Sequence, residues 1–415
     1  MNSRRDAFPV ERVRAEFPAL QRAGNAVFFD NAAGAQVPQA VFDAVNQHLL
    51  ERMVQRGGRY AQSIAVDKSI ARARASVAAL VNARDPNEIA FGMNATSFIR
   101  LISLAIGQTL GARREIIVTD LDHEANVATW LALAPLGATF RWWRMRDDGN
   151  LYLDDLAQLV SPQTRLLACS VASNALGTIV DVRGVADLVH AVGGEVFLDC
   201  VHFAPHGSVD VQAFDCDYLV CSGYKIFGPH MGFLWGRYAL LERLPTFREE
   251  FIPDAPPGKI EAGTVCYENV AGMDAAVGYL AELGRSLSPG RGDMREDIVS
   301  AMQAILAYEQ GLTVEMLKVL RECNAQVHGI CDPARIAGRV PTISFNVEGV
   351  APSAVTEAMA RADIGIRDGH MYCPRLMRRL GLPEASGTVR VSLAHYNTVA
   401  EIHRFGNVLS ELIPA

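Results

Sequence analysis

Two ionisable side chains that could take part in catalysis, a carboxylate and an amine, each follow a short apolar segment. Asp199 comes directly after Val196–Leu198, and Lys225 comes four residues after Tyr218–Cys221. A carboxylate or an ammonium group beside a buried segment costs free energy unless it has a partner. A lysine amine can act as a nucleophile or a base, and a carboxylate can pair with a protonated group. We therefore expect both residues to act on one ligand.

The elements that carry these residues are predicted to be strands. Short apolar segments bounded by turn residues are typical of strands buried on both faces of a parallel sheet. In open α/β sheets, ligands bind just beyond the carboxyl ends of the strands, which would bring Asp199 and Lys225 together. On pattern alone, a solvated loop lysine and a helix-capping aspartate explain the two residues equally well.

The neighbouring residues favour the shared site. Ser222-Gly223-Tyr224-Lys225, with Gly228-Pro229 and Gly232, resembles the lysine motif of the class V aminotransferases, the group that contains the cysteine desulfurases. The resemblance implies that Lys225 forms a Schiff base with pyridoxal 5'-phosphate (PLP). Asp199-Cys200-Val201-His202 resembles the family's upstream motif, in which the aspartate keeps the pyridine nitrogen protonated so that the ring accepts electrons.

The resemblance also implies a fold. It predicts an α/β protein of the PLP-dependent transferase fold (fold type I), with a mainly parallel central sheet in a large domain and a smaller C-terminal α+β domain. The predicted boundaries are 25–289 for the large domain, and 1–24 with 290–415 for the small domain. The alternation in Thr342–Val347 predicts a half-exposed strand in the small domain.

Further motifs would hold the cofactor's phosphate. Asn94-Ala95-Thr96-Ser97 follows a predicted strand and begins a predicted helix, and backbone N–H groups at such a terminus bind anions. Thr96 matches the family's hydroxyl, whereas Ala95 stands where a second threonine is common. The resemblance adds Ser222 and Tyr224 as phosphate ligands. Thr264, in Glu261-Ala262-Gly263-Thr264, would donate a hydrogen bond to the cofactor phosphate bound in a partner subunit. A homodimer is therefore expected.

Three residues are expected to contact the cofactor ring. His123, in Asp122-His123-Glu124-Ala125-Asn126, would lie flat on the ring and could act as an acid or a base; a surface histidine is the alternative. Asn174 would donate to the phenolic oxygen of the ring. His202 would lie near the same oxygen, at a position that is often glutamine in the desulfurases.

The substrate is expected to be an amino acid. Val389–Asn397 resembles the family's R-x-S-[LF]-x-x-Y-N signature, whose arginine, here Arg390, would grip the α-carboxylate. Asn31, in the loop FFDNAAGAQVP, would border the substrate. Arg59 follows a glycine-rich turn and could reach across a dimer, although a solvated arginine explains it equally well.

The reaction depends on one loop. Desulfurases carry a nucleophilic cysteine in R-x-G-x-x-C, and here Arg367–Pro374 reads RDGHMYCP. The cysteine position holds Tyr372, which could shape a pocket for another substrate, and Cys373 comes one residue later as a candidate catalytic thiol. We expect cysteine desulfurase-like C–S cleavage on L-cysteine or a cysteine conjugate. Transamination, epimerisation and a catalytically silent PLP-binding sulfur-relay partner remain alternatives.

Composition bounds the remaining possibilities. The chain has 415 residues, a net charge of −7 and no basic block, so nucleic acid is not an expected partner. No segment has the length and apolarity of a membrane span or a signal peptide. The eight cysteines form no C-x-x-C pair, which argues against a zinc site or disulfides. These features predict a cytoplasmic protein without a bound metal.

Overall fold

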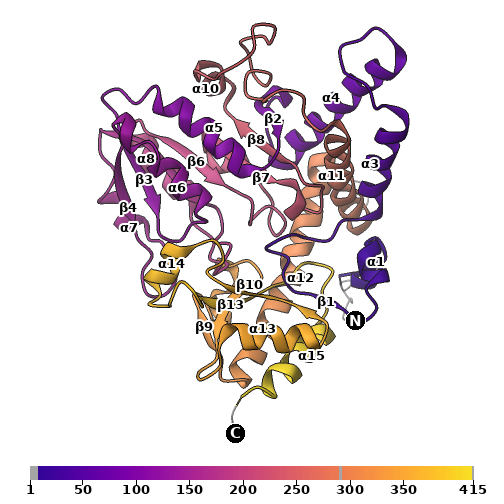
Figure 1. Ribbon diagram of the computed structural model, residues 1–415, viewed down its shortest axis with the longest axis vertical. Helices are drawn as coiled ribbons and strands as arrows, with labels where there is room; N and C mark the ends of the chain where they lie inside the picture. The colour runs from indigo at the N-terminus through magenta and orange to yellow at the C-terminus, as the bar shows by residue number, and fades with distance from the viewer. Residues whose placement is uncertain (1–7, 289–291, 414–415) are drawn as a thin grey trace.

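A seven-stranded sheet forms the centre of the larger part of the molecule (Figure 1). The computed structural model describes residues 8–288 and 292–413. In spatial order the strands are β2 (Ile89–Gly92), β8 (Gly232–Gly236), β7 (Tyr218–Ser222), β6 (Glu195–Asp199), β5 (Thr164–Ser170), β3 (Glu115–Thr119) and β4 (Thr139–Trp143). The strands from β7 to β4 run parallel to one another, and β8 runs antiparallel to both of its neighbours. The mainly parallel central sheet is thereby confirmed.

Helices cover both faces of this sheet, which is why its central strands are apolar throughout. Ile116 and Val118 point into one core and Ile117 points into the other, as the alternation of a strand requires. The first core includes α5 (Ala95–Gly107), α6 (Ala125–Leu131) and α10 (Tyr238–Arg243). The second includes α4 (Ala61–Val81), α7 (Leu153–Ala157), α8 (Val182–Ala191), α9 (Val211–Phe214) and α11 (Tyr267–Leu287), and α3 (Gln39–Glu51) packs on α11.

A four-stranded antiparallel sheet organises the smaller part of the molecule. Its order is β12 (Arg367–Gly369), β13 (Thr388–Ser392), β10 (Thr342–Asn346) and β9 (Gln326–His328). Helices α13 (Pro352–Arg361), α14 (Pro374–Arg379) and α15 (Val399–Ser410) belong to this part. The expectation of a half-exposed strand at 342–347 was wrong: Thr342–Phe345 are all buried. One face of β10 packs on the apolar core of the small domain, and the other lies against the large domain, where Ser344 bonds to Ala175.

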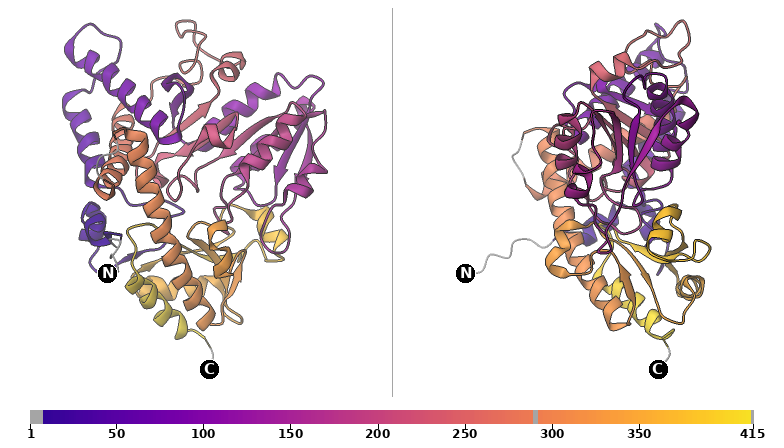
Figure 2. Two further views of the ribbon diagram at one scale, coloured as in Figure 1. Left: turned by 180° about the vertical axis from the view of Figure 1, so that it is seen from behind. Right: turned by 90° about the vertical axis from the view of Figure 1, so that its left-hand side faces the viewer.

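The two parts are joined by α12 (Met294–Glu322), which runs from the large part down into the small part (Figure 2). Its first half packs in the large core, and its second half packs in the small one. The strand β1 (Val27–Phe28) pairs with β11 (Ile364–Gly365) of the small domain. The N-terminal helices α1 (Val10–Ala15) and α2 (Pro18–Arg22) place apolar side chains in the large core. The predicted boundary at 289/290 lies outside the described residues.

Two properties of the described residues bear on partners. None of their helices is long and apolar enough to cross a membrane. Among the same residues, no three histidine, cysteine, aspartate or glutamate side chains are grouped to hold a metal ion.

Candidate active site

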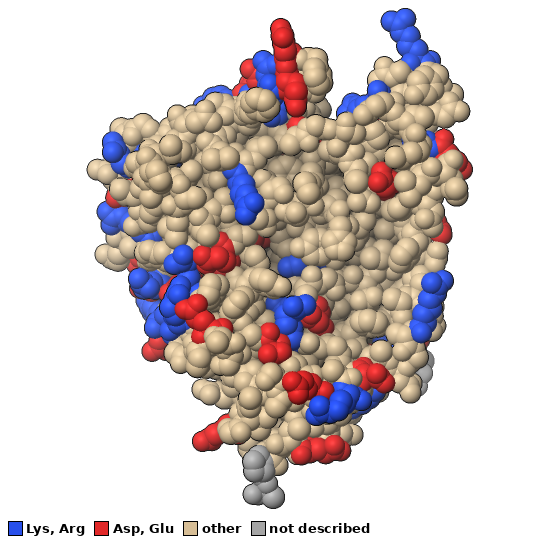
Figure 3. Space-filling model, viewed as in Figure 1, with Lys and Arg blue, Asp and Glu red and all other residues tan. Residues whose placement is uncertain are grey.

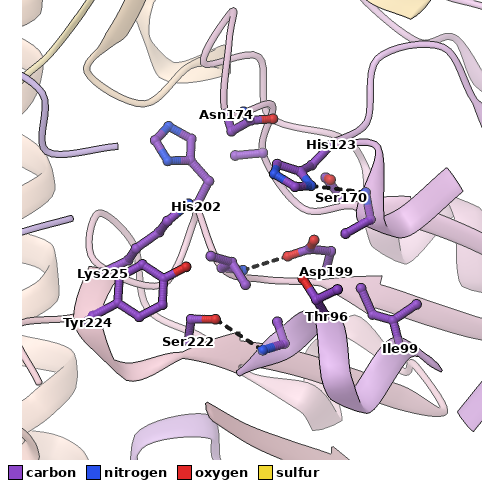
Figure 4. A pocket seen from close by; sticks show the side chains of 14 residues that line it. Thr96, Ile99, His123, Ser170, Asn174, Asp199, His202, Ser222, Tyr224 and Lys225 are labelled. Atoms are coloured by element: carbon purple, nitrogen blue, oxygen red, sulfur yellow. Dashed lines mark hydrogen bonds between the residues drawn. The ribbon is translucent and has the colours of Figure 1, made fainter. Parts of the chain in front are cut away.

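A pocket opens at the carboxyl ends of β5, β6 and β7, beside the N-terminus of α5 (Figure 4). This is the position that an open α/β sheet favours for a ligand. Residues predicted from distant parts of the sequence meet there. The lining includes Ala95, Thr96, His123, Asn174, Asp199, His202, Ser222, Tyr224 and Lys225.

Lys225 ends the short 3₁₀ turn Gly223–Lys225 that directly follows β7. Burial lowers the pKa of its amine to about 8, and the positive charge of Arg390 adds to this effect, while Asp199 opposes it. An amine with a pKa near neutrality is available in its unprotonated form to attack a carbonyl carbon. The geometry therefore suits a Schiff-base lysine.

Asp199 is the last residue of β6 and is buried. One of its carboxylate oxygens accepts a hydrogen bond from the backbone N–H of Val201 at 3.0 Å. Burial raises the pKa of this carboxyl, and Lys225 partly offsets the rise. The second oxygen makes no hydrogen bond with the described residues and could pair with a protonated ring nitrogen.

His123 lies on the opposite side of the pocket, just before α6. Its Nδ1 accepts the N–H of Ala125 at 3.1 Å, so the proton of the neutral ring stays on Nε2. Burial, aided by Lys225 and Arg390, lowers the pKa of His123 to about 4, so the ring is neutral near pH 7. A neutral, flat imidazole can stack on a planar cofactor and donate a hydrogen bond through Nε2.

The N-terminus of α5 lines the pocket at the residues that the sequence analysis expects to hold a phosphate. Asn94 caps the helix by accepting the N–H of Ser97 at 2.9 Å, and Ser222 accepts the N–H of Ala95 at 3.1 Å. The hydroxyl of Thr96 lines the same pocket. Because the N–H groups of Ala95 and Ser97 are already bonded, a phosphate would be held by the hydroxyls of Thr96 and Ser222 and by the partial positive charge of the thirteen-residue helix.

Asn174 and His202 border the pocket where the two domains meet. The side-chain amide of Asn174 donates to the carbonyl oxygen of Met371 at 2.8 Å. The Nε2 atom of His202 lies 2.9 Å from the hydroxyl of Thr342, on the small domain. Both residues are thus fixed by small-domain groups while they line the pocket.

Arg390 is fully buried, on the small-domain strand β13. It donates to the backbone oxygen of Asn174 and to Asp30, both at 2.9 Å, and its Nε has no partner among the described residues. Arg367 also binds Asp30, at 2.9 Å, so one carboxylate serves two guanidinium groups. The surplus positive charge and the available Nε would suit the α-carboxylate of a substrate.

The side chain of Asn31 is occupied within the fold. It donates to the carbonyl oxygens of Phe28 and Ser392 and accepts from the hydroxyl of Tyr396. A contact between Asn31 and a substrate would therefore have to come from its backbone, whereas the carboxylate of the preceding Asp30 reaches Arg390.

Arg59 and Thr264 lie outside the pocket. Arg59 is exposed on the loop between α3 and α4. Thr264 lines a neighbouring groove together with Thr96 and Tyr224, and its hydroxyl accepts from Gln55 at 3.0 Å. The roles predicted for both residues involve a second subunit and stay predictions.

The loop that precedes α14 places Tyr372 and Cys373 in opposite environments. Tyr372 is 52% exposed, and its ring stacks on that of His123 with centroids 5.7 Å apart. Cys373 is completely buried in an apolar cluster, and its thiol lies 3.1 Å from the amide oxygen of Asn174. Burial raises the pKa of this thiol to about 12, so it stays protonated. These surroundings do not support the predicted catalytic role of Cys373.

Some residues of the site were not predicted to act in it. Ser170 ends β5 and lines the pocket, and Asp122 accepts the backbone N–H of Ser170 at 2.7 Å. Burial raises the pKa of Asp122 to about 7. Asp30 and Asp122 directly precede the predicted residues Asn31 and His123, so position alone could have indicated these two.

The pocket fits pyridoxal phosphate, the cofactor that the resemblance implies. It combines an anion-binding helix terminus, a lysine amine, a flat neutral histidine and a buried carboxylate with an oxygen left for a ligand. These groups match the phosphate, aldehyde, ring face and ring nitrogen of the cofactor. Each of these four parts of the cofactor therefore has a matching group in the pocket.

Comparison with known proteins agrees with this fit. The family model described as "Aminotransferase class-V" matches residues 27–405. The chain is 35% identical to the "Aminotransferase-like protein FGM3" of Gibberella zeae over 95% of this chain and 96% of that protein. It is 33% identical to a cysteine desulfurase of Serratia proteamaculans, over 96% of this chain and 97% of that protein.

A solved structure extends the similarity to the fold. The cysteine desulfurase of Thermococcus onnurineus NA1 superposes with a TM-score of 0.87 and 26% identity, over 100% of this chain and 99% of that one. These relatives belong to PLP-dependent families. The chain therefore belongs to the class V aminotransferase family, as a cysteine desulfurase-like member that uses pyridoxal phosphate.

Proposed function

We propose that this protein cleaves the C–S bond of L-cysteine or a cysteine conjugate by eliminating the β-substituent, without forming a persulfide on the protein. The observation that carries the proposal is the loop at 371–373. Tyr372 occupies the place of the sulfur-accepting cysteine, and the adjacent thiol, that of Cys373, is buried and held protonated. A nucleophile toward sulfur must be a reachable thiolate.

The bond changes in this reaction balance without a further reactant except water. A base removes the proton from Cα, the Cβ–S bond breaks, and its electron pair leaves with sulfur, which takes up a proton. For L-cysteine the products after hydrolysis are hydrogen sulfide, pyruvate and ammonia. The cofactor supplies the electron sink that makes the Cα proton removable.

The residues of the chain have distinct roles in this proposal. Arg390 binds the α-carboxylate, and Asp199 holds the proton of the ring nitrogen. The amine of Lys225, with its pKa lowered to about 8, exchanges protons at Cα. The Nε2–H of His123 can donate a hydrogen bond to the leaving sulfur, because its Nδ1 already accepts the N–H of Ala125.

Transamination is the second candidate. It is supported by the 35% identity to a protein named aminotransferase-like and by the unsuitable surroundings of Cys373. In that reaction the proton removed from Cα is returned to the cofactor, and no bond at Cβ breaks. Pyridoxamine phosphate with no sulfide would favour transamination over the first proposal.

The test is to replace Cys373 by serine in the PLP-loaded protein and to measure sulfide release from L-cysteine. Elimination predicts a rate within about twofold of the unchanged protein, because no step passes through the thiol. Cys331→Ser, at an exposed cysteine, is the matched control. Loss of activity in the Cys373 variant alone, with its visible spectrum intact, would refute the proposal.

We further infer that the protein works as a homodimer. Large apolar side chains are exposed in the grooves that Thr264 lines, among them Met93 at 76% and Phe251 at 80%. In Figure 3 the centre of the upper face is largely uncharged, whereas charged groups of both signs stand along its top edge and gather lower down. Such a surface suits burial against a second copy, which would bring Arg59 and Thr264 toward the partner's pocket. The cytoplasmic location stays a prediction.

A further inference from the structure

A hydrogen bond across the domain boundary holds the histidine at the rim of the pocket. His202 follows β6 of the large domain, and Thr342 begins β10 of the small domain. Both are buried, and Nε2 of His202 lies 2.9 Å from the hydroxyl of Thr342. Among the described residues, neither the ring nor the hydroxyl makes another hydrogen bond. Within that part of the chain, the contact is therefore the one polar restraint on the orientation of the ring.

The surroundings of the ring keep it neutral. On one side His206 packs edge-on, with centroids 5.5 Å apart, and its Nδ1 bonds to Glu309 of α12 at 2.8 Å. Lys225, which lines the same pocket, and Arg390 both add positive charge near the ring. Burial, strengthened by these positive neighbours and by His206, lowers the pKa of His202 well below its ordinary value.

A neutral imidazole carries one proton, so the partner of one nitrogen decides what the other can do. If the hydroxyl of Thr342 donates to Nε2, the proton lies on Nδ1, and the ring can donate to a ligand in the pocket. If Nε2 donates to the hydroxyl, Nδ1 is a bare acceptor. An anionic oxygen in the pocket is compatible only with the first arrangement.

We propose that Thr342 is a positioning residue that donates to Nε2 of His202 and so presents Nδ1–H to the phenolic oxygen of bound pyridoxal phosphate. Thr342 lies on β10, which pairs with the strand that carries Arg390, in the register Ser344 to Arg390. The small domain would thereby set the electronic state of the cofactor as well as bind the substrate. The inference rests on PLP binding and on no particular reaction.

The test follows the visible absorbance of the substrate-free, PLP-loaded protein as a function of pH. A donor to the phenolic oxygen weakens the hold of that oxygen on the Schiff-base proton. Thr342→Val should therefore raise the pH midpoint of the absorbance change by about one unit, a tenfold change in proton affinity. Thr342→Ser, which keeps the hydroxyl, should restore the midpoint of the unchanged protein.

Two controls separate this role from a structural one. Thr388→Val removes another buried small-domain hydroxyl, which bonds to Phe345 away from the pocket, and should leave the midpoint unchanged. In a His202→Phe background, Thr342→Val should have no further effect, because the two changes remove the same interaction. A Thr342→Val protein that titrates like the unchanged one, or an equal shift in the His202→Phe background, would overturn the proposal.

Discussion

At the scale of single residues, charge and burial decide which side chains are ready to react. Lys225 and Arg390 are both cationic and enclosed, and Asp30 and Asp199 compensate them only in part. The pocket therefore favours an anion. A phosphate at α5 and a carboxylate at Arg390 are the two anions that a PLP-bound amino acid would supply.

The lowered pKa of Lys225 predicts a dependence of stability on pH in the cofactor-free protein. Its pKa is about 8 in the folded chain, against 10.5 for an unperturbed lysine, so the folded state binds fewer protons between these limits. The free energy of unfolding should therefore rise from pH 8 to pH 10.5, by up to about 3 kcal/mol. Urea denaturation should show this rise, and it should be absent in Lys225→Met.

The same substitution tests the covalent role of the lysine. Lys225→Met should bind PLP without the visible absorbance of a Schiff base, because no other described lysine lines the pocket. An unchanged visible spectrum would remove Lys225 from the proposed mechanism.

A substitution at Arg390 should weaken substrate binding and leave cofactor binding almost unchanged. Arg390→Lys keeps one positive charge but loses the planar pair of donors, so amino-acid affinity should fall roughly tenfold to a hundredfold. PLP affinity should change little, since Arg390 does not line the cofactor pocket. Titration of the visible spectrum with substrate measures the first quantity, and PLP removal by dialysis measures the second. Equal amino-acid affinity would contradict the carboxylate role.

Residue types and spacing predicted much of this site. The lysine, aspartate and histidine motifs each follow a short apolar strand, and parallel strands end at the same edge of a sheet. What the sequence could not predict was which way neighbouring side chains point. Tyr372 and Cys373 are adjacent in the chain, yet one is exposed and the other is buried. That difference depends on backbone angles within a loop, which spacing does not report.

At the scale of elements, hydrogen bonds to the large domain hold the loop at 370–375 in place. Met371 and Tyr372 both have positive φ angles, 51° and 58°, which non-glycine residues adopt only when contacts compensate for the strain. The contacts here are the bond from Glu124 N–H to the oxygen of Tyr372, at 2.8 Å, and the amide of Asn174. A loop restrained in this way differs from a mobile loop whose cysteine would carry sulfur away from the pocket.

This restraint predicts the reactivity of Cys373. In the native protein, alkylating reagents should modify the exposed Cys266 and Cys331 and spare Cys373. Asn174→Ala removes the hydrogen bonds to Met371 and to the thiol, so modification of Cys373 should become at least several times faster. Peptide mass spectrometry measures the rate at each cysteine. Rapid modification of Cys373 in the unchanged protein would show that the loop opens.

Secondary-structure elements were predicted best where a single hydrophobicity pattern identified them. Strands buried on both faces have a continuous apolar signature, and β6 and β7 follow it. The pattern of β10 alternates, but its polar residues are buried because they face the other domain, where Thr342 meets His202 and Ser344 meets Ala175. The periodicity of polar residues cannot tell whether the polar face of a strand contacts solvent or a second domain.

At the scale of the whole molecule, the site lies where the two domains meet. The large domain supplies the pocket for the cofactor, and the small domain supplies Arg390, Thr342 and the loop with Tyr372. The long helix α12 fixes their separation, because it packs in both cores.

The exposed apolar surface predicts the oligomeric state. The unchanged protein should have about twice the mass of its 45.1 kDa chain in solution. Phe251→Glu places a charge in a groove that Thr264 lines, within the proposed interface, and should shift the mass toward one chain. Val399→Glu, at an exposed residue of α15 in the small domain, should not. Light scattering after size-exclusion chromatography measures both. A monomeric unchanged protein would contradict the dimer.

The most direct test of the proposed chemistry is a quantitative analysis of the products formed from L-cysteine by the PLP-loaded protein. Elimination predicts sulfide and pyruvate in equal amounts, with no alanine and no sulfur bound to the protein. Alanine with protein-bound sulfur would show desulfuration through a persulfide and would contradict the account of Cys373 as a buried, unreactive thiol.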